Sequence, residues 1–286
     1  MSGFTDHLDG VGTAYLERLT EADLRTLVRA DRAAPAEVAA RIAALHRQPA
    51  LVLDVLDRPA TSAQILNLAA DRSLSFVSPF LVFAAAIHRT AADLAGTSYA
   101  PERTNPRQRV PVFDALQLAA YLAQPSHRLF LADLLTSFAR VSSGVTVVRT
   151  ARGMQRRRWN DLDPASLAVL LESVPERQRP HVWRRLGDLA LFLVGVFPDA
   201  AEQVVVDRLA ALRLAQLTGL GPQDVPDGRG PQLLEGLGAG WYRLAARGGA
   251  HAQLAEEFYP ARRVLNAATD RYLLPVQTGW FGAPRP

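Results

Sequence analysis

The chain has 286 residues, 49% of them hydrophobic, and a formal net charge of +4 at pH 7, which is the composition of a globular protein with a sizeable core. Cysteine is absent, which excludes disulfides, thiolate metal sites and cysteine nucleophiles. All 32 basic residues are arginine, and the lack of lysine excludes P-loop, Schiff-base and kinase chemistries.

Residues 1–98 are predicted to form an N-terminal helical region. Apolar residues such as Leu24, Leu27 and Val28 recur at helical spacing. The pair Ser78-Pro79 is a typical helix start, and residues 80–94 after it are apolar on nearly every face. This pattern predicts a helix at the centre of the region. We expect His88, within that helix, to lie at the edge of the core or to cap a helix rather than to bind a metal.

Residues 99–111 interrupt the helical pattern. They contain three prolines and three arginines, and the prolines favour an extended backbone. We predict a connection between two halves of the chain at this point. The alternative is a long surface loop, with the two halves packed as one domain.

Residues 144–159 predict a β-hairpin, which is the only β structure that the sequence indicates. Val145, Val147 and Val148 are β-branched and suit a strand. Gly153 can adopt a positive φ in the turn, and the residues after it alternate roughly between two faces. Because an isolated hairpin is only marginally stable in water, we expect this one to pack against helices.

The hairpin is strongly basic. Edge arginines that stay solvated and prevent aggregation are the simpler interpretation. The more specific interpretation is that the hairpin is a wing that binds an anion or nucleic acid. Helices predicted at 114–122 and 128–140 precede it, which is the order of elements in a winged helix-turn-helix. Against it, the second helix is nearly all Leu, Phe and Ala and lacks polar residues that read base edges. The candidate anion- or partner-binding residues are Arg149, Arg152, Arg156, Arg157 and Arg158.

Residues 112–274 are predicted to form a C-terminal helical region that includes the hairpin, and residues 275–286 an irregular tail. One helix is expected over 200–217, capped by Asp199. The glycines at 236, 238 and 240 are expected to break the chain between helices at 232–237 and 240–247. They follow no predicted strand, so they do not indicate a dinucleotide-binding loop.

Asp188 is the single ionisable residue within the apolar stretch 186–197. An unpaired buried carboxylate is costly, and Arg184 and Arg185 lie one helical turn before it. We therefore predict a structural ion pair that involves Arg184, Arg185 and Asp188, and we expect it to fix this helix against the hairpin.

No local motif indicates an enzyme. The sequence has no GxSxG, no two of its six histidines lie within five residues of each other, and no glutamate is followed three positions later by histidine. We therefore predict no cofactor, no metal ligand and no catalytic residue from local sequence. A catalytic or ligand site dispersed along the chain stays open.

The predicted location is the bacterial cytoplasm. The start, MSGFTDHLDG, is acidic and lacks the basic and apolar regions of a signal peptide. The longest apolar runs, Phe80–Ile87 and Leu189–Phe197, are too short to cross a bilayer. A lysine-free chain rich in Ala and Arg is also typical of a GC-rich genome.

These observations predict a mainly α fold, a multi-helix bundle or array with one central basic β-hairpin. The favoured hypothesis is a non-enzymatic structural or protein-interaction protein, an adaptor or scaffold that binds a protein partner or a second copy of itself. The alternative is a nucleic-acid-binding or regulatory protein that uses the hairpin arginines. An enzyme or ligand-binding protein with a dispersed site is the second alternative.

Overall fold

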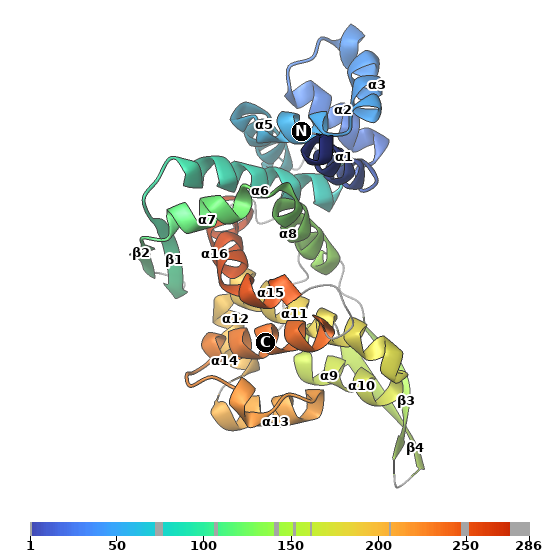
Figure 1. The fold of residues 1–286 in the computed structure, drawn as a ribbon, viewed down its shortest axis with the longest axis vertical. Helices are drawn as coiled ribbons and strands as arrows, with labels where there is room; N and C mark the ends of the chain where they lie inside the picture. Colours follow the sequence, from blue (N-terminus) through green and yellow to red (C-terminus); the bar gives the residue numbers. More distant parts are fainter. Residues whose placement is uncertain are drawn as a thin grey trace. The chain divides into compact units, whose positions relative to one another are not determined.

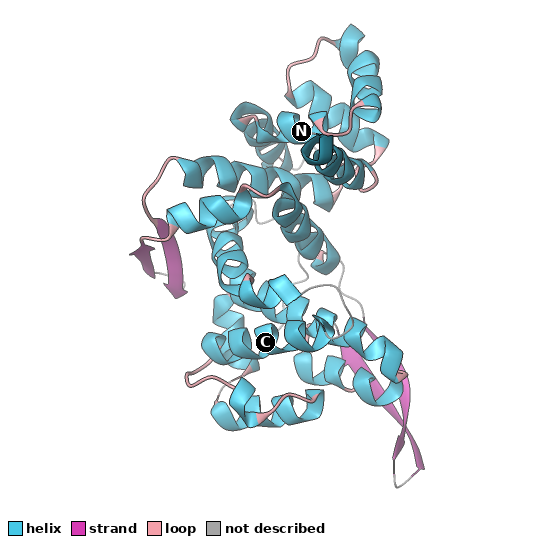
Figure 2. Cartoon of the chain, viewed as in Figure 1, coloured by secondary structure: helices cyan, strands magenta, loops and turns pink. Residues whose placement is uncertain are grey.

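The computed structural model describes residues 2–71, 77–105, 108–139, 143–150, 153–160, 162–205, 207–246 and 252–274. Helices make up most of these residues, and a β-hairpin lies near the middle of the chain (Figure 2). The structure therefore confirms the predicted mainly α fold with a central hairpin.

The chain forms two compact units, and neither is one continuous stretch. The first unit contains the described residues within 1–102, 110–139 and 267–280, and the second those within 103–109 and 140–266. The chain thus crosses between the units twice within the segment 99–111, which was predicted as a connection: after residue 102 and after residue 109. Residues 110–139 belong to the first unit, together with the N-terminal helices.

The first unit is helical apart from the ends of two short strands (Figure 1). Its longest described helix is α6, over Pro79–Ala95. The other elements of this unit are α1 (Ser2–Leu16), α2 (Glu21–Ala30), η1 (Pro35–Glu37), α3 (Val38–Arg47), α4 (Leu51–Asp57), α5 (Pro59–Ala70), α7 (Ala115–Leu122), α8 (Pro125–Phe138) and the short π-helix η4 (Thr269–Leu273).

Helix α6 forms the core of the first unit, and it starts where the sequence predicts. The Ser78 hydroxyl accepts a hydrogen bond from the Leu81 amide, and Pro79 occupies the first turn. Residues Phe80–Ile87 are each at most 2% exposed, because α4, α5, α7 and α8 all pack against α6. Burying each large side chain in this row contributes roughly 1.5–3 kcal/mol.

The second unit is centred on the packing of α11 (Arg179–Val196) against α14 (Pro231–Ala246). Its other helices are α9 (Pro164–Ala168), α10 (Leu170–Ser173), η2 (Glu176–Gln178), α12 (Pro198–Val204), α13 (Arg208–Thr218), η3 (Pro222–Asp224), α15 (Ala252–Glu256) and most of α16 (Phe258–Ala268).

The expected helix break at glycines 236, 238 and 240 is wrong, because α14 runs through all three. At Gly238 the missing side chain permits close packing. A Cβ atom there would lie 2.5 Å from the Phe258 ring and 2.7 Å from the Cβ of Ala190 on α11. Tertiary contact therefore outweighs the low helix propensity of glycine at this position.

The single helix expected over 200–217 is also wrong. Helix α12 ends at Val204, and α13 starts after Asp207, whose side chain accepts a hydrogen bond of 2.8 Å from the Ala210 amide. On α13, Leu209 is 56% exposed, whereas Leu214 is buried.

The structure contains β pairing that the sequence did not predict. Strands β1 (Ala100–Asn105) and β2 (Gln108–Val112) pair within the proline-rich segment, so its extended backbone is used in a two-stranded sheet. The predicted hairpin consists of β3 (Ser143–Thr150) and β4 (Gly153–Asn160), which are antiparallel. It packs against α9 and α10, as a marginal hairpin requires.

Candidate functional site

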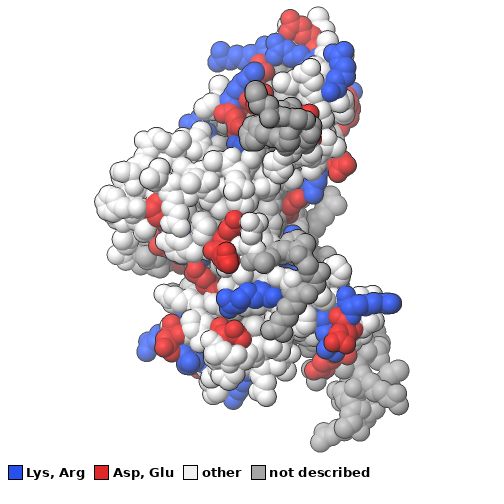
Figure 3. Space-filling model, viewed as in Figure 1, with Lys and Arg blue, Asp and Glu red and all other residues white. Residues whose placement is uncertain are grey.

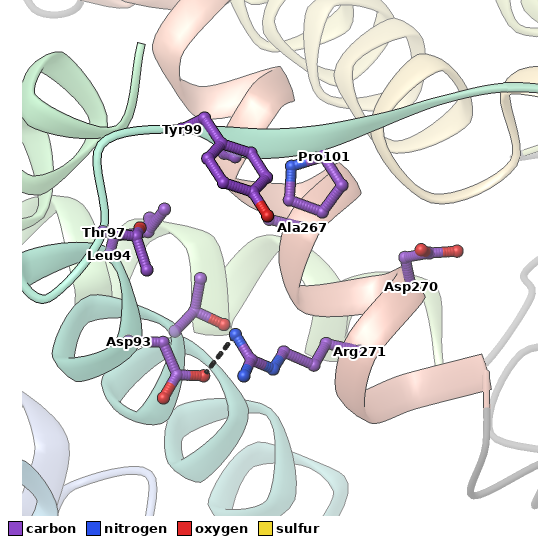
Figure 4. A pocket seen from close by; sticks show the side chains of 10 residues that line it. Asp93, Leu94, Thr97, Tyr99, Pro101, Ala267, Asp270 and Arg271 are labelled. Carbon is purple, nitrogen blue, oxygen red and sulfur yellow. Dashed lines mark ion pairs between the residues drawn. The ribbon is translucent and has the colours of Figure 1, made fainter. Parts of the chain in front are cut away.

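The first unit contains a cavity of about 600 Å³, a size typical of small-molecule pockets (Figure 4). Its walls come from the last turns of α6, the start of β1, and the residues around η4, and all of its lining residues belong to the first unit. Leu94, Ala100, Pro101 and Ala267 give it an apolar wall. Polar groups are added by threonines and by Asp93, Tyr99, Asp270 and Arg271.

Asp93 in the cavity wall is fully engaged by neighbouring donors. Its carboxylate lies 3.1 Å from Nη1 of Arg271 and 3.4 Å from Nε of Arg89, and it accepts a hydrogen bond from the Tyr272 hydroxyl. Burial, together with this hydrogen bond, raises the pKa of Tyr272, which keeps the hydroxyl protonated as a donor. With its side chain only 14% exposed, Asp93 has little capacity left for an incoming cation.

An exposed apolar patch adjoins the cavity, and we define it as Tyr99, Phe113 and Leu116. Phe113 and Leu116 are 80% and 84% exposed, and Tyr99, which lines the cavity, is 49% exposed. The rings of Tyr99 and Phe113 are in contact, with centroids 6.1 Å apart. On the face that Figure 3 shows, almost no charged side chains lie over α6 and α7. Large apolar side chains this exposed typically mark an interaction site.

No local motif indicated this site, because the cavity residues come from two distant segments, 90–101 and 267–271. Asp93 and Arg271 are far apart in the chain, and neither belongs to a local motif. The proline-rich segment from 99 was predicted as a connection, so its apolar residues were not read as a surface. The available signal was Phe113, placed directly before the start of a predicted helix, followed three positions later by Leu116.

A second polar cluster lies inside the first unit, on four different helices. The Tyr15 hydroxyl is 3.0 Å from Nε2 of His88, and Nδ1 of His88 is 2.6 Å from Oδ1 of Asp57. Arg128 donates from Nη1 to the same Asp57 oxygen. The carboxylate fixes the proton on Nδ1, so Nε2 accepts the hydrogen bond from Tyr15.

This cluster has the order of a nucleophile–base–acid relay, but the hydroxyl in the nucleophile position is closed off from solvent. Tyr15 is 0% exposed and His88 is 1% exposed, so no substrate reaches the hydroxyl. A smaller cavity of about 290 Å³ touches His88, Asp57 and Arg128, whereas Tyr15 does not line it. The cluster therefore stabilises the fold by holding α1, α4, α6 and α8 together.

The pKa values of His88 and Asp57 in this cluster are both lowered from their ordinary values. Burial lowers the pKa of His88, which outweighs the opposing effect of its hydrogen bond to Asp57. Burial alone would raise the pKa of Asp57, but the hydrogen bond from His88 and the charge of Arg128 lower it overall. His88 is consequently a neutral imidazole, and Asp57 a carboxylate, at pH 7.

We expect acid to destabilise the first unit through His88. Below pH 6.5, the ordinary pKa of histidine, His88 is protonated in the unfolded chain but stays neutral in the folded one. The free energy of unfolding therefore decreases as the pH falls from about 6.5 towards the lowered pKa of folded His88. Between pH 7 and 5.5 the loss is at most about 1.2 kcal/mol, the value for a folded His88 that stays unprotonated throughout. Hydrogen exchange of α6 amides at both pH values measures it. His88→Gln should remove this pH dependence, whereas His46→Gln, at an exposed position, should not. An equal pH dependence in both variants would contradict the role given to His88.

The hairpin arginines are brought together along two paired strands. In the β3–β4 register, Arg149 is opposite Met154, Arg156 is opposite Val147, and Arg158 is opposite Val145, with Arg157 between the last two on β4. Arg152 lies outside the described residues, and so do the side chains of the other four. The hairpin belongs to the second unit, whereas α7 and α8 belong to the first. Nucleic-acid binding by a wing therefore stays a prediction.

Asp188 lies on α11 in the second unit. Its carboxylate is 3.8 Å from Nε of Arg184 and accepts a hydrogen bond of 2.7 Å from the Tyr242 hydroxyl on α14. Burial raises the pKa of Asp188, and the charges of Arg184 and Arg185 and the Tyr242 hydrogen bond offset only part of that effect. The contact with Tyr242 links α11 to α14, and no sequence signal indicated it.

Among the described residues, no group of three or more His, Asp or Glu side chains is arranged to hold a metal ion. Within the same part of the chain, no helix has both the length and the apolar character needed to span a membrane. No family model, curated protein or solved structure matches this chain.

Proposed function

We propose that this is a non-enzymatic protein-interaction protein that associates with a second copy of itself through the apolar patch. The observation that carries the proposal is the exposure of Phe113 and Leu116, at 80% and 84%, beside the partly exposed Tyr99. Leaving such side chains in water forgoes roughly 1.5–3 kcal/mol each that a covering surface would recover. Aromatic residues in particular supply much of the energy of protein interfaces.

A second copy suits this patch because the patch carries no charge. In a two-fold dimer the same surface meets itself, so a charged patch would place like charges opposite each other. Tyr99, Phe113 and Leu116 avoid that repulsion. Phe113 directly precedes the Asp114 N-cap position of α7, and Leu116 lies in its first turn, so both are held on a defined element. A pre-ordered surface loses little conformational entropy when it binds.

The test measures mass against concentration by light scattering or sedimentation at low salt. The wild-type chain should dimerise, and Leu116→Glu should weaken the dimer about 100-fold, equivalent to about 2.7 kcal/mol, because it buries a charge in an apolar interface. The matched control is Leu209→Glu on α13, where the leucine is 56% exposed and outside the patch. It should leave the dimer intact.

Two outcomes would overturn the proposal: a chain that stays monomeric at every concentration, or a dimer that Leu116→Glu leaves unchanged. The ratio of absorbance at 260 and 280 nm in the same preparation tests the hairpin hypothesis. Co-purifying nucleic acid that salt removes would favour binding through Arg156 and its neighbours.

A further inference from the structure

The 600 Å³ cavity in the first unit has donors to spare, while its buried carboxylate is already occupied. Asp93 is approached by three donors, from Arg89, Arg271 and Tyr272. By contrast, the Tyr99 hydroxyl has no hydrogen-bond partner among the described residues. Asp93, 3.1 Å from Nη1, is the ion-pair partner of Arg271 within the described part of the chain. A guanidinium has five N–H donors and the Arg271 side chain is 63% exposed, so N–H groups remain for a ligand.

The shape of the site separates these donors from the remaining carboxylate. In Figure 4 Arg271 extends towards Asp93 and the interior, while Asp270 points in the opposite direction, and the Tyr99 hydroxyl points into the same space. The Asp93 contact and the Tyr272 ring, 5.9 Å from the guanidinium, hold Arg271 in place. A ligand that meets Arg271 and Tyr99 therefore does not have to approach Asp270.

We infer that this cavity binds a small monocarboxylic acid with an apolar body. The carboxylate accepts from Arg271 and Tyr99, since hydrogen bonds from arginine to a carboxylate are among the strongest in proteins. The body lies against Leu94, Ala100, Pro101 and Ala267. A cation is disfavoured because two guanidinium groups already neutralise Asp93. The inference does not rest on the proposed self-association.

Isothermal titration calorimetry with octanoate, octylammonium and 1-octanol on the full chain tests the charge preference. Octanoate should bind at least tenfold more tightly than the other two probes. Arg271→Gln should weaken octanoate binding at least tenfold, and Tyr99→Phe, which keeps the ring and removes the hydroxyl, roughly fivefold. Arg243→Gln, an exposed arginine of α14 that pairs with Asp224, is the matched control and should change nothing.

Two further variants locate the site. Asp270→Asn should leave octanoate binding unchanged or slightly tighter, and Leu116→Glu should leave it unchanged because Leu116 is outside the cavity. Equal affinity for the three probes, tighter binding of octylammonium, or an Arg271→Gln variant that binds octanoate like the wild type would overturn the inference. Loss of dimerisation in Leu116→Glu with octanoate binding retained would separate this site from the proposed interface.

Discussion

Asp57→Ala is expected to lower the free energy of unfolding of the first unit by about 3 kcal/mol. Asp57 is the shared acceptor for Arg128 and His88, whose side chains are 10% and 0% exposed. Its removal leaves a nearly buried guanidinium without its anion and His88 Nδ1 without its acceptor. Because the Asp57 side chain is itself 42% exposed, we expect the lower end of the range for broken buried pairs. Hydrogen exchange of α6 amides gives the measurement.

Asp54→Ala on the same helix is the control for this effect. Asp54 is exposed in the first turn of α4, and among the described residues no hydrogen bond or ion pair joins it to the cluster. Its loss should therefore cost under about 1 kcal/mol, mainly through the helix dipole. The double variant Asp57→Leu with Arg128→Met should recover part of the loss, because it removes both charges together. An Asp57→Ala chain as stable as Asp54→Ala would show that the cluster contributes nothing.

Gly238→Val is expected to destabilise the second unit by about 3 kcal/mol. Even the first carbon of the new side chain would meet the Phe258 ring at 2.5 Å and the Ala190 Cβ at 2.7 Å. Helix α14 must then move away from α11 or the ring must turn out of the core. Trp183 and Trp241 donate hydrogen bonds to Thr218 in this unit, so tryptophan fluorescence during urea unfolding reports the change.

The neighbouring Ala239→Val separates packing from helix propensity. Ala239 is partly exposed on the same helix, and replacing it with valine costs roughly 0.5 kcal/mol through propensity alone. Gly238→Ala sharpens the comparison, because propensity predicts a gain of about 1 kcal/mol and close packing predicts a loss. A more stable Gly238→Ala chain would disprove close packing as the reason for glycine at this position.

Local signals in the sequence predicted the elements that depend on local chemistry. Ser78-Pro79 marks the start of α6, and the valines with Gly153 mark the central hairpin, because caps, turns and β-branched residues act within a few positions. The errors arose where distant residues decide the outcome. In the sequence Gly238 indicates a helix break. In the structure it lies within a helix, where the absence of a side chain lets Phe258 and Ala190 pack closely against it. The pairing of β1 with β2 was missed because prolines in an extended segment do not reveal a partner strand.

The polar sites were beyond sequence reasoning for a related reason. Tyr15, Asp57, His88 and Arg128 meet only after four helices pack, and each of them alone is an ordinary residue on its helix. The ion pair of Asp188 with Arg184 was foreseeable because one helical turn separates the two. Its contact with Tyr242 was not, since that residue lies on another helix.

The arrangement of the chain has a consequence for how the protein is made. Tyr272 and Asp93 are 179 positions apart, and residues 140–266 of the second unit are inserted between the parts of the first. Synthesis proceeds from the N-terminus, and domains that are continuous can fold as they emerge from the ribosome. Here the cavity wall is complete only when residues 267–271 have been synthesised, so a chain that is truncated before η4 lacks Arg271 and cannot form the site. Closing so long a loop costs entropy, and prior folding of the inserted unit shortens it.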